Sequence, residues 1–184
     1  HKVFGPTKYA ATLEGSKAFS KDFMARHNIP TAAYKEVNTY DEAIVALESF
    51  SYPVVVKADG LAAGKGVVIC DNEKTAIETL KEMMIDGSLD GAGSKVVLEE
   101  FLTGFECSLL CFTDGKTIVP MVSAKDHKQI YDGNKGPNTG GMGTVSPNPF
   151  MPDNMDEVIQ KDILDPFMAG LAADQMDYRG VVFI

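Results

Sequence analysis

Four residues in one short stretch have the types and spacing of a phosphate-binding loop. The sequence VVVKADGLAAGKGVVI, residues 54–69, contains Gly60, Gly64, Lys65 and Gly66 between two apolar, β-branched runs. Glycine lets backbone N–H groups approach an anion closely, and lysine supplies positive charge. The stretch therefore predicts a loop that closes over phosphate groups.

This stretch departs from both common glycine-rich nucleotide motifs. A P-loop needs four residues between its glycines and a hydroxyl residue after Gly-Lys, whereas here Gly60 and Gly64 enclose three residues and Gly66 takes the hydroxyl position. Both motifs lead into a helix, whereas the apolar run at 67–70 predicts a strand. We therefore expect a flap between two strands. The alternative without a ligand is a glycine-rich surface hairpin with solvated lysines.

Lys57 stands at the end of the first predicted strand. A charge at such a position is costly unless it lies at an edge or meets an anion. We therefore expect Lys57 to matter more for activity than Lys65, although Lys65 has the more conspicuous glycine setting.

Three carboxylates stand at or after the end of another predicted strand, in VVLEEFLTGFE, residues 96–106. They are Glu99, Glu100 and Glu106. Carboxylates suit hard cations such as Mg²⁺, and they equally suit the amino group of adenine and the hydroxyls of ribose. A solvated turn is the plain structural reading. The residues alone leave these alternatives open.

The composition limits the possible partners. The formal net charge is −9, and polyanion binding needs a basic surface that displaces counterions, so we expect no nucleic-acid partner. A single nucleotide needs only a few placed lysines and N–H groups. No apolar run approaches the ~20 residues that span a membrane, and the first ten residues lack the apolar core of a signal peptide. We expect no membrane partner and a cytoplasmic location.

The three cysteines, Cys70, Cys107 and Cys111, are odd in number and form no CxxC pair. Small buried cysteines behave as hydrophobic residues, so we expect reduced, buried thiols rather than a metal site.

The hydrophobic patterning predicts helices alternating with strands and a hairpin, which favours an α+β fold. Helices are expected after Ser16 to about 28, from 39 to 50, from 72 to 86 and from 153 to 176, where Pro166 should kink the helix or start a second one. Strands are expected at 31–37, 54–57, 67–70 and 95–101, with a hairpin around the Asp114-Gly115 turn. The polar, glycine-rich residues 125–149 are expected to form a long loop. Since the last strand is cut short at residue 184, we expect a longer parent chain.

Together, several motifs resemble those of a known family. KADGLAAGKG at 57–66, followed by LEEFLTGFE, resembles the ATP-grasp ligases. FGPT at 4–7, LEGSKAF at 13–19, KDHK at 125–128 and GPNTGGMG at 136–143 narrow the resemblance to the glycinamide ribonucleotide synthetases, or phosphoribosylamine–glycine ligases, of purine biosynthesis. The resemblance extends over essentially the whole sequence.

The resemblance implies an ATP-grasp fold, in which two α+β subdomains with antiparallel sheets grip ATP. Residues 1–30 would lead into the fold, residues 31–102 would form the small lid subdomain with the glycine flap, and residues 103–184 would begin the larger catalytic subdomain.

The resemblance also implies an activity. Such a ligase joins glycine to 5-phosphoribosylamine through glycyl phosphate, using ATP and Mg²⁺. The family's Mg²⁺ ligands, in an E-x-N motif, would lie beyond residue 184, and a domain that binds the substrate phosphate would precede residue 4. We therefore expect the 184 residues alone to be inactive. Another ATP-grasp ligase or carboxylase subunit, a nucleotide-binding module without catalysis and a structural α+β domain are the alternatives.

Finally, the resemblance implies roles for individual residues. The ATP phosphates would be bound by Lys17, Lys57, Gly64, Lys65 and Gly66, of which Lys57 and Lys65 would be catalytic. Adenine would be read by Glu99 and by the backbone of Glu100 and Leu102, and the ribose hydroxyls would be held by Glu106. The substrate side would be lined by Asp126, His127, Lys128, Asn138, Thr139, Gly140, Gly141 and Met142, with His127 serving as a general base or as a loop anchor.

Overall fold

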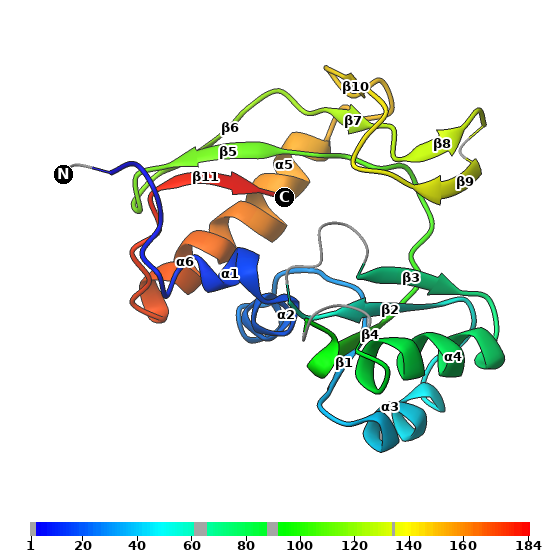
Figure 1. Cartoon of the computed structure of the whole chain (residues 1–184). Coiled ribbons are helices and arrows are strands. Elements are labelled where there is room, and N and C mark those ends of the chain that lie inside the picture. The colour runs from blue at the N-terminus through cyan, green and yellow to red at the C-terminus, as the bar shows by residue number, and fades with distance from the viewer. Residues whose placement is uncertain (1–2, 61–65, 88–91, 134) are drawn as a thin grey trace. The chain divides into compact units, whose positions relative to one another are not determined.

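The computed structural model describes residues 3–60, 66–87, 92–133 and 135–184 (Figure 1). The chain forms two compact units. The glycine-loop unit contains residues 12–26 and 30–103, and the C-terminal unit contains residues 1–11, 27–29 and 104–184. Each unit has its own antiparallel sheet and its own helices, which agrees with the expected α+β class.

The glycine-loop unit is built around a four-stranded antiparallel sheet with the strand order β1-β4-β2-β3. Its strands are β1 (Tyr34–Val37), β2 (Val54–Ala58), β3 (Val67–Cys70) and β4 (Val96–Glu100). Its helices are α1 (Thr12–Gly15), α2 (Lys17–Arg26), α3 (Tyr40–Leu47), α4 (Glu73–Met84) and the short 3₁₀ helix η1 (Ala92–Ser94).

The two faces of this sheet carry different side chains, because successive residues of a strand point to opposite faces. Val54 and Val56 of β2 and Leu98 of β4 are buried in one core with residues of α3 and α4. These two helices lie on one side of the sheet (Figure 1). The alternate residues, Lys57 and Glu99, therefore lie on the other face. The alternation places charged groups opposite the main core.

Side-chain caps start three helices of this unit. The Ser16 hydroxyl accepts a hydrogen bond from the Phe19 N–H, Thr39 accepts from the Glu42 N–H, and Asn72 accepts from the Thr75 N–H. These caps satisfy N–H groups that have no partner within the helix. The three capping residues stand where the sequence predicts these helices to begin, at positions 16, 39 and 72.

The C-terminal unit contains a three-stranded antiparallel sheet, in the order β11-β5-β6, and a helical layer on one face (Figure 1). The strands are β5 (Leu110–Thr113), β6 (Ile118–Pro120) and β11 (Gly180–Phe183). The helical layer contains α5 (Met155–Ile159), the π-helical turn η2 (Gln160–Leu164) and α6 (Asp165–Ala173). Pro166 lies in the first turn of α6, as expected for a residue without an N–H to donate.

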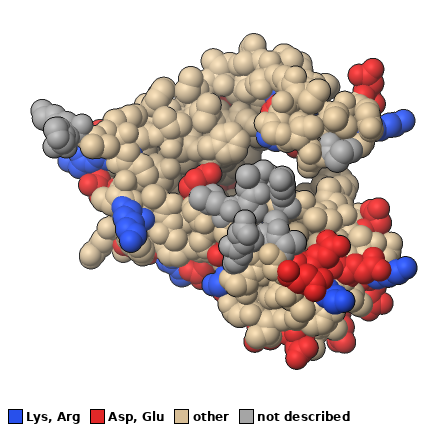
Figure 2. Space-filling view, viewed as in Figure 1, with Lys and Arg blue, Asp and Glu red and all other residues tan. Residues whose placement is uncertain are grey.

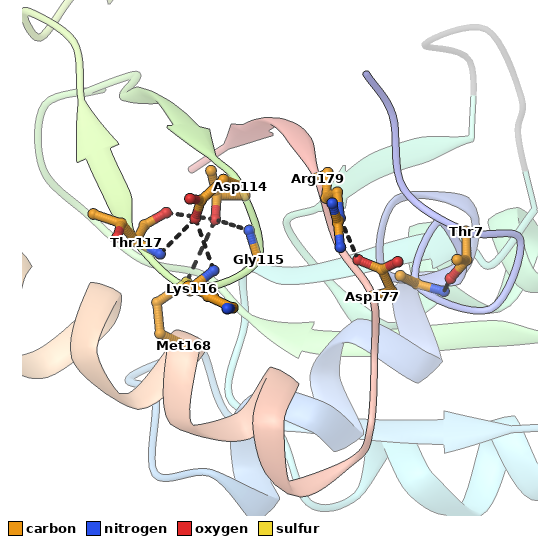
Figure 3. Close-up of polar contacts among 10 residues, drawn as sticks. Thr7, Asp114, Gly115, Lys116, Thr117, Met168, Asp177 and Arg179 are labelled. Atoms are coloured by element: carbon orange, nitrogen blue, oxygen red, sulfur yellow. Dashed lines mark hydrogen bonds and ion pairs between the residues drawn. The ribbon is translucent and has the colours of Figure 1, made fainter. Parts of the chain in front are cut away.

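The predicted Asp-Gly hairpin joins β5 to β6 (Figure 3). The Asp114 carboxylate accepts hydrogen bonds from the N–H groups of Lys116, at 2.9 Å, and Thr117, at 2.8 Å. Gly115 has φ +87°, a conformation that favours glycine. The turn chemistry of the sequence therefore sets the hairpin.

The expectation of one long loop over residues 125–149 is wrong. Four short strands form there, and they pair as β7 (Lys125–Asp126) with β10 (Thr144–Val145) and as β8 (Gln129–Tyr131) with β9 (Lys135–Asn138). Gly136 has φ +83°, and a Cβ there would lie 2.5 Å from the Tyr131 ring. Backbone pairing thus forms strands in a segment whose side chains give little strand signal, and Gly136 packs closely against the Tyr131 ring.

All three cysteines are free, and Cys70 and Cys111 are buried as expected, whereas Cys107 is only partly buried. Burial raises the pKa of the Cys70 and Cys111 thiols. Acidic side chains gather on the visible face of the unit that carries α3 and α4 (Figure 2). Within the described ranges, no helix has the length and apolar character needed to cross a membrane.

Candidate functional site

The expected pair of strands around the glycine loop is present. Strand β2 pairs antiparallel with β3, with Lys57 opposite Val67, and the Ala58 N–H donates to the Gly66 carbonyl at 2.7 Å. A strand therefore follows the glycine-rich stretch, at the place where a P-loop leads into a helix. The predicted phosphate contacts of Gly64 and Lys65 lie outside the described residues, whereas Gly66 closes the base of the loop.

Three charged side chains from three elements meet beside this loop. Lys57 Nζ of β2 lies 2.8 Å from Glu99 Oε2 of β4, and Lys21 Nζ of α2 lies 3.0 Å from the same oxygen. The side chains of Lys21 and Glu99 are 9% and 5% exposed, whereas that of Lys57 is 27% exposed. We call these three residues the Lys21–Glu99–Lys57 cluster.

Lys21 is held by several further contacts. Its ammonium donates to the Thr31 hydroxyl at 2.7 Å and to the Ala32 carbonyl at 3.3 Å, and it lies 5.7 Å from the centre of the Tyr34 ring. Burial lowers the pKa of Lys21, and the hydrogen bond with Glu99 opposes this shift. Since an ammonium has three N–H donors, the contacts with Thr31, Ala32 and Glu99 occupy all of them.

Asp59 joins the start of the glycine loop to helix α2. Its Oδ1 accepts from the Ala18 N–H at 2.7 Å, and both of its oxygens lie 3.0 Å from the Ser16 hydroxyl. A carboxylate at a helix N-terminus is stabilised by the helix dipole. Lys17 Nζ donates to the Gly60 carbonyl at 3.3 Å, and burial lowers the pKa of Lys17 while Asp59 opposes that shift.

The other predicted nucleotide residues have different environments. The Glu100 carboxylate accepts from the Ala33 N–H at 2.8 Å, and Leu102 is exposed. Glu106 is exposed in the C-terminal unit. The Glu99 carboxylate forms ion pairs with Lys21 and Lys57, which suits a role in positioning the two lysines. Its contact with adenine remains a prediction.

The predicted substrate residues form two neighbouring segments in the C-terminal unit. Thr139 donates to the Lys128 carbonyl through its N–H at 2.7 Å and its hydroxyl at 2.8 Å. The Met142 N–H donates to the His127 carbonyl at 2.7 Å. The structure therefore brings residues 126–128 beside residues 139–142, although the two motifs are separated in sequence.

Asp126 is the charged centre of this second group. Its carboxylate pairs with Lys128 Nζ at 2.5 Å. A Cβ at Gly141, which has φ +121°, would lie 3.0 Å from Asp126 Oδ1, so glycine there leaves room for the carboxylate. His127 is exposed, with Nδ1 3.3 Å from the Gly143 carbonyl. Asn138 pairs in register with Gln129, and Gly140 is exposed.

The sequence did not point to Lys21 or Asp59 as site residues, nor to the hydrogen bond from the Ser16 hydroxyl to Asp59. One signal was available for Lys21, because it follows Lys17 by four residues and therefore shares a face of the helix. Asp59 lies within the flap motif, but its partner on α2 is distant in sequence.

The described part of the chain contains no group of three or more His, Cys, Asp or Glu side chains arranged to hold a metal ion. No chemical step is assigned to a metal here, and the use of Mg²⁺ remains a prediction.

Comparisons with known proteins identify the family of this chain. Residues 15–184 match the family model described as phosphoribosylglycinamide synthetase, ATP-grasp (A) domain. Phosphoribosylamine–glycine ligases of Clostridium acetobutylicum and Fusobacterium nucleatum are 53% and 50% identical over 99% and 98% of this chain. The chain spans only 44% and 42% of those relatives.

A solved structure shows the same fold. The crystal structure of phosphoribosylamine–glycine ligase from Thermotoga maritima superposes with a TM-score of 0.92 at 38% identity, covering 99% of this chain and 46% of that one. The predicted ATP-grasp fold and the predicted family are confirmed. The chain belongs to the phosphoribosylglycinamide synthetase ATP-grasp (A) domain family.

Proposed function

We propose that this chain is part of an ATP-dependent carbon–nitrogen ligase of purine biosynthesis that joins glycine to 5-phosphoribosylamine. The products are glycinamide ribonucleotide, ADP and phosphate. The observation that carries the proposal is the match of nearly the whole chain to relatives named phosphoribosylamine–glycine ligase. The lysines beside the glycine loop supply a matching chemistry. The proposed cofactors are ATP and Mg²⁺, and the proposed location is the cytoplasm.

In this proposal the glycine-loop unit binds ATP. Lys17 and Lys57, with residues 64–66, contact the phosphates, and Lys57 and Lys65 stabilise the charge on the transferred phosphoryl group. Phosphoryl transfer depends mainly on such positioning and charge stabilisation. The proposed adenine contacts are Glu99, Glu100 and Leu102, and Glu106 contacts the ribose.

The proposed reaction has two steps. The glycine carboxylate attacks the γ-phosphorus of ATP, which forms glycyl phosphate and releases ADP. The amine of 5-phosphoribosylamine then attacks the glycyl carbonyl, which forms the amide and releases phosphate. Acyl phosphates hydrolyse in water, so a flap that excludes water protects the intermediate.

The proposed substrate side contains Asp126, His127, Lys128 and residues 138–142. Asp126 carries negative charge suited to the amine or hydroxyls of 5-phosphoribosylamine. The contact between His127 and the Gly143 carbonyl supports a role as a loop anchor.

The test measures ADP release by the protein at its full natural length. ADP release should require both glycine and 5-phosphoribosylamine, and the product should contain the new amide. Reactions without each substrate are the controls. Equal ADP release with bicarbonate or another carboxylic acid in place of glycine would show that the proposed substrate is wrong.

A further inference from the structure

Two cations share one carboxylate oxygen in the Lys21–Glu99–Lys57 cluster. Glu99 Oε2 lies 3.0 Å from Lys21 Nζ and 2.8 Å from Lys57 Nζ. With both lysines charged, the formal charge of the cluster is +1. A pair of Glu99 and Lys57 alone would have no net charge.

The two lysines differ in their access to a ligand. The Lys21 side chain is 9% exposed, and its three N–H donors are occupied by Glu99, Thr31 and Ala32. The Lys57 side chain is 27% exposed, and the described residues provide one hydrogen-bond partner for its ammonium, Glu99. Among the described residues, Lys57 therefore keeps donors for a ligand, whereas Lys21 does not.

We propose that Lys21 is a positioning residue, whose buried ammonium neutralises Glu99 so that the charge of Lys57 remains available to the nucleotide phosphates. This inference rests on the proposed function, in which Lys57 contacts those phosphates. The ion pair with Glu99 orders the Lys57 side chain. A long flexible side chain that is already ordered loses less entropy when it binds a ligand. The positive charge of Lys21 offsets the negative charge of Glu99, so the ion pair does not cancel the positive charge of Lys57.

The alternative is that Lys21 only holds α2 against β1 and β4. The two roles predict different losses of affinity. If Lys21 were merely structural, its removal would weaken the binding of both the adenosine part and the phosphate groups of ATP. If Lys21 compensates the charge of Glu99, its removal weakens the binding of the phosphate groups. The comparison of ATP with adenosine therefore separates the two roles.

The experiment measures the dissociation constants of ATP and adenosine by calorimetry and competition, with the protein at its full natural length. Lys21→Met should weaken ATP binding about tenfold and leave adenosine binding within about twofold. Lys57→Met should weaken ATP binding at least as much. The matched control is Lys81→Met, which removes the same charge from an exposed position on α4 and should change neither constant.

A double variant gives the stricter test. Lys21→Met combined with Glu99→Gln removes both the buried cation and the anion, so Lys57 regains an uncompensated charge. Its preference for ATP over adenosine should return to within about threefold of the wild-type preference. This variant also tests the inference if Lys21→Met alone fails to fold, since it leaves no unpaired buried charge.

The outcomes distinguish the two proposals. If the wild-type protein does not bind ATP, the proposed function fails. If Lys57→Met weakens ATP binding but Lys21→Met does not, the proposed function stands and the inference about Lys21 is wrong. The inference is also wrong if Lys21→Met weakens adenosine and ATP equally, or if the double variant regains no preference for ATP.

Discussion

At Gly93, the backbone of another element leaves no room for a side chain. A Cβ at this position would lie 2.3 Å from the Met83 carbonyl oxygen and 2.9 Å from its carbon, at the end of α4. Because the obstacle is backbone, it cannot rotate away. Gly93→Ala should therefore destabilise the fold by about 1–3 kcal/mol, the usual cost of overpacking.

The measurement for Gly93 is urea unfolding of the wild-type protein and Gly93→Ala. The matched control is Gly15→Ala, in the same unit, because a Cβ there has no heavy atom within 4 Å. The control should stay within about 0.5 kcal/mol of the wild type. Equal destabilisation by both variants would contradict the steric explanation.

Asp114 is expected to make folding stability depend on pH. Hydrogen bonds from the Thr117 and Lys116 N–H groups hold the pKa of its carboxyl below the usual value of 3.8 (Figure 3). Because the pKa is lower in the folded state, the Asp114 carboxylate contributes to the free energy of unfolding above pH 3.8. This contribution is lost as the pH falls through the pKa of the folded state. Asp114→Asn should therefore be less stable than the wild type at neutral pH.

This stability difference should narrow as the pH falls below 3.8, because the wild-type carboxyl then becomes neutral as well. Urea unfolding midpoints of both proteins across the acid range measure it. A difference that stays constant from neutral to acid pH would show that the carboxylate charge is not responsible.

At the scale of the residue, only part of the Lys21–Glu99–Lys57 cluster could be predicted from the sequence. Lys57 was predictable, because a lysine that ends a buried strand needs an anion. The pairing of Glu99 with Lys21 was not, because it depends on which face of α2 packs against β4. The exposed-looking Glu99-Glu100 pair gave no sign that only Glu99 is buried, since that depends on the registry of the sheet.

At the scale of the element, the start of α4 depends on one side chain. Asn72 Oδ1 accepts from the Thr75 N–H at 3.0 Å and from the Thr75 hydroxyl at 3.2 Å. Asn72→Ala should lower the free energy of unfolding by about 1 kcal/mol. Asn72→Ser, which keeps a capping oxygen, should recover most of this loss in the same urea titration. If serine and alanine were equally destabilising, capping would not explain the effect.

The elements differ in how well their sequences predicted them. Helix α4 has both a cap and an apolar stripe, so its existence and the approximate position of its start could be predicted. The β8–β9 pair could not, because its residues are polar and glycine-rich and its ordering depends on a close fit between Gly136 and the Tyr131 ring. The helix η1 could not be predicted either, because Gly93 packs against the backbone of Met83, a contact that the sequence does not show.

At the scale of the whole molecule, the two units have separate cores. Leu98 lies fully buried in β4, among residues of β2, α3 and α4, and Leu171 lies buried in α6 of the C-terminal unit. Helix α2 belongs to the glycine-loop unit, in which Ala18 contacts Asp59 and Lys21 contacts Glu99. The sequence alone showed the helix, but its unit depends on tertiary contacts.

These separate cores predict which residues open together. Leu98→Ala should cost about 2–5 kcal/mol, because it leaves a cavity in a closely packed core. In the protein at its full natural length, hydrogen exchange should then accelerate in residues 12–26 and 30–103, with α2 included. Leu171→Ala is the reciprocal variant, and it should accelerate exchange in residues 104–184 instead. Each variant thus serves as the control for the other, since local opening follows cooperative structural units. Equal acceleration across the whole chain in both variants would show that the two units open as one, and protection of α2 in Leu98→Ala would separate that helix from the sheet on which it packs.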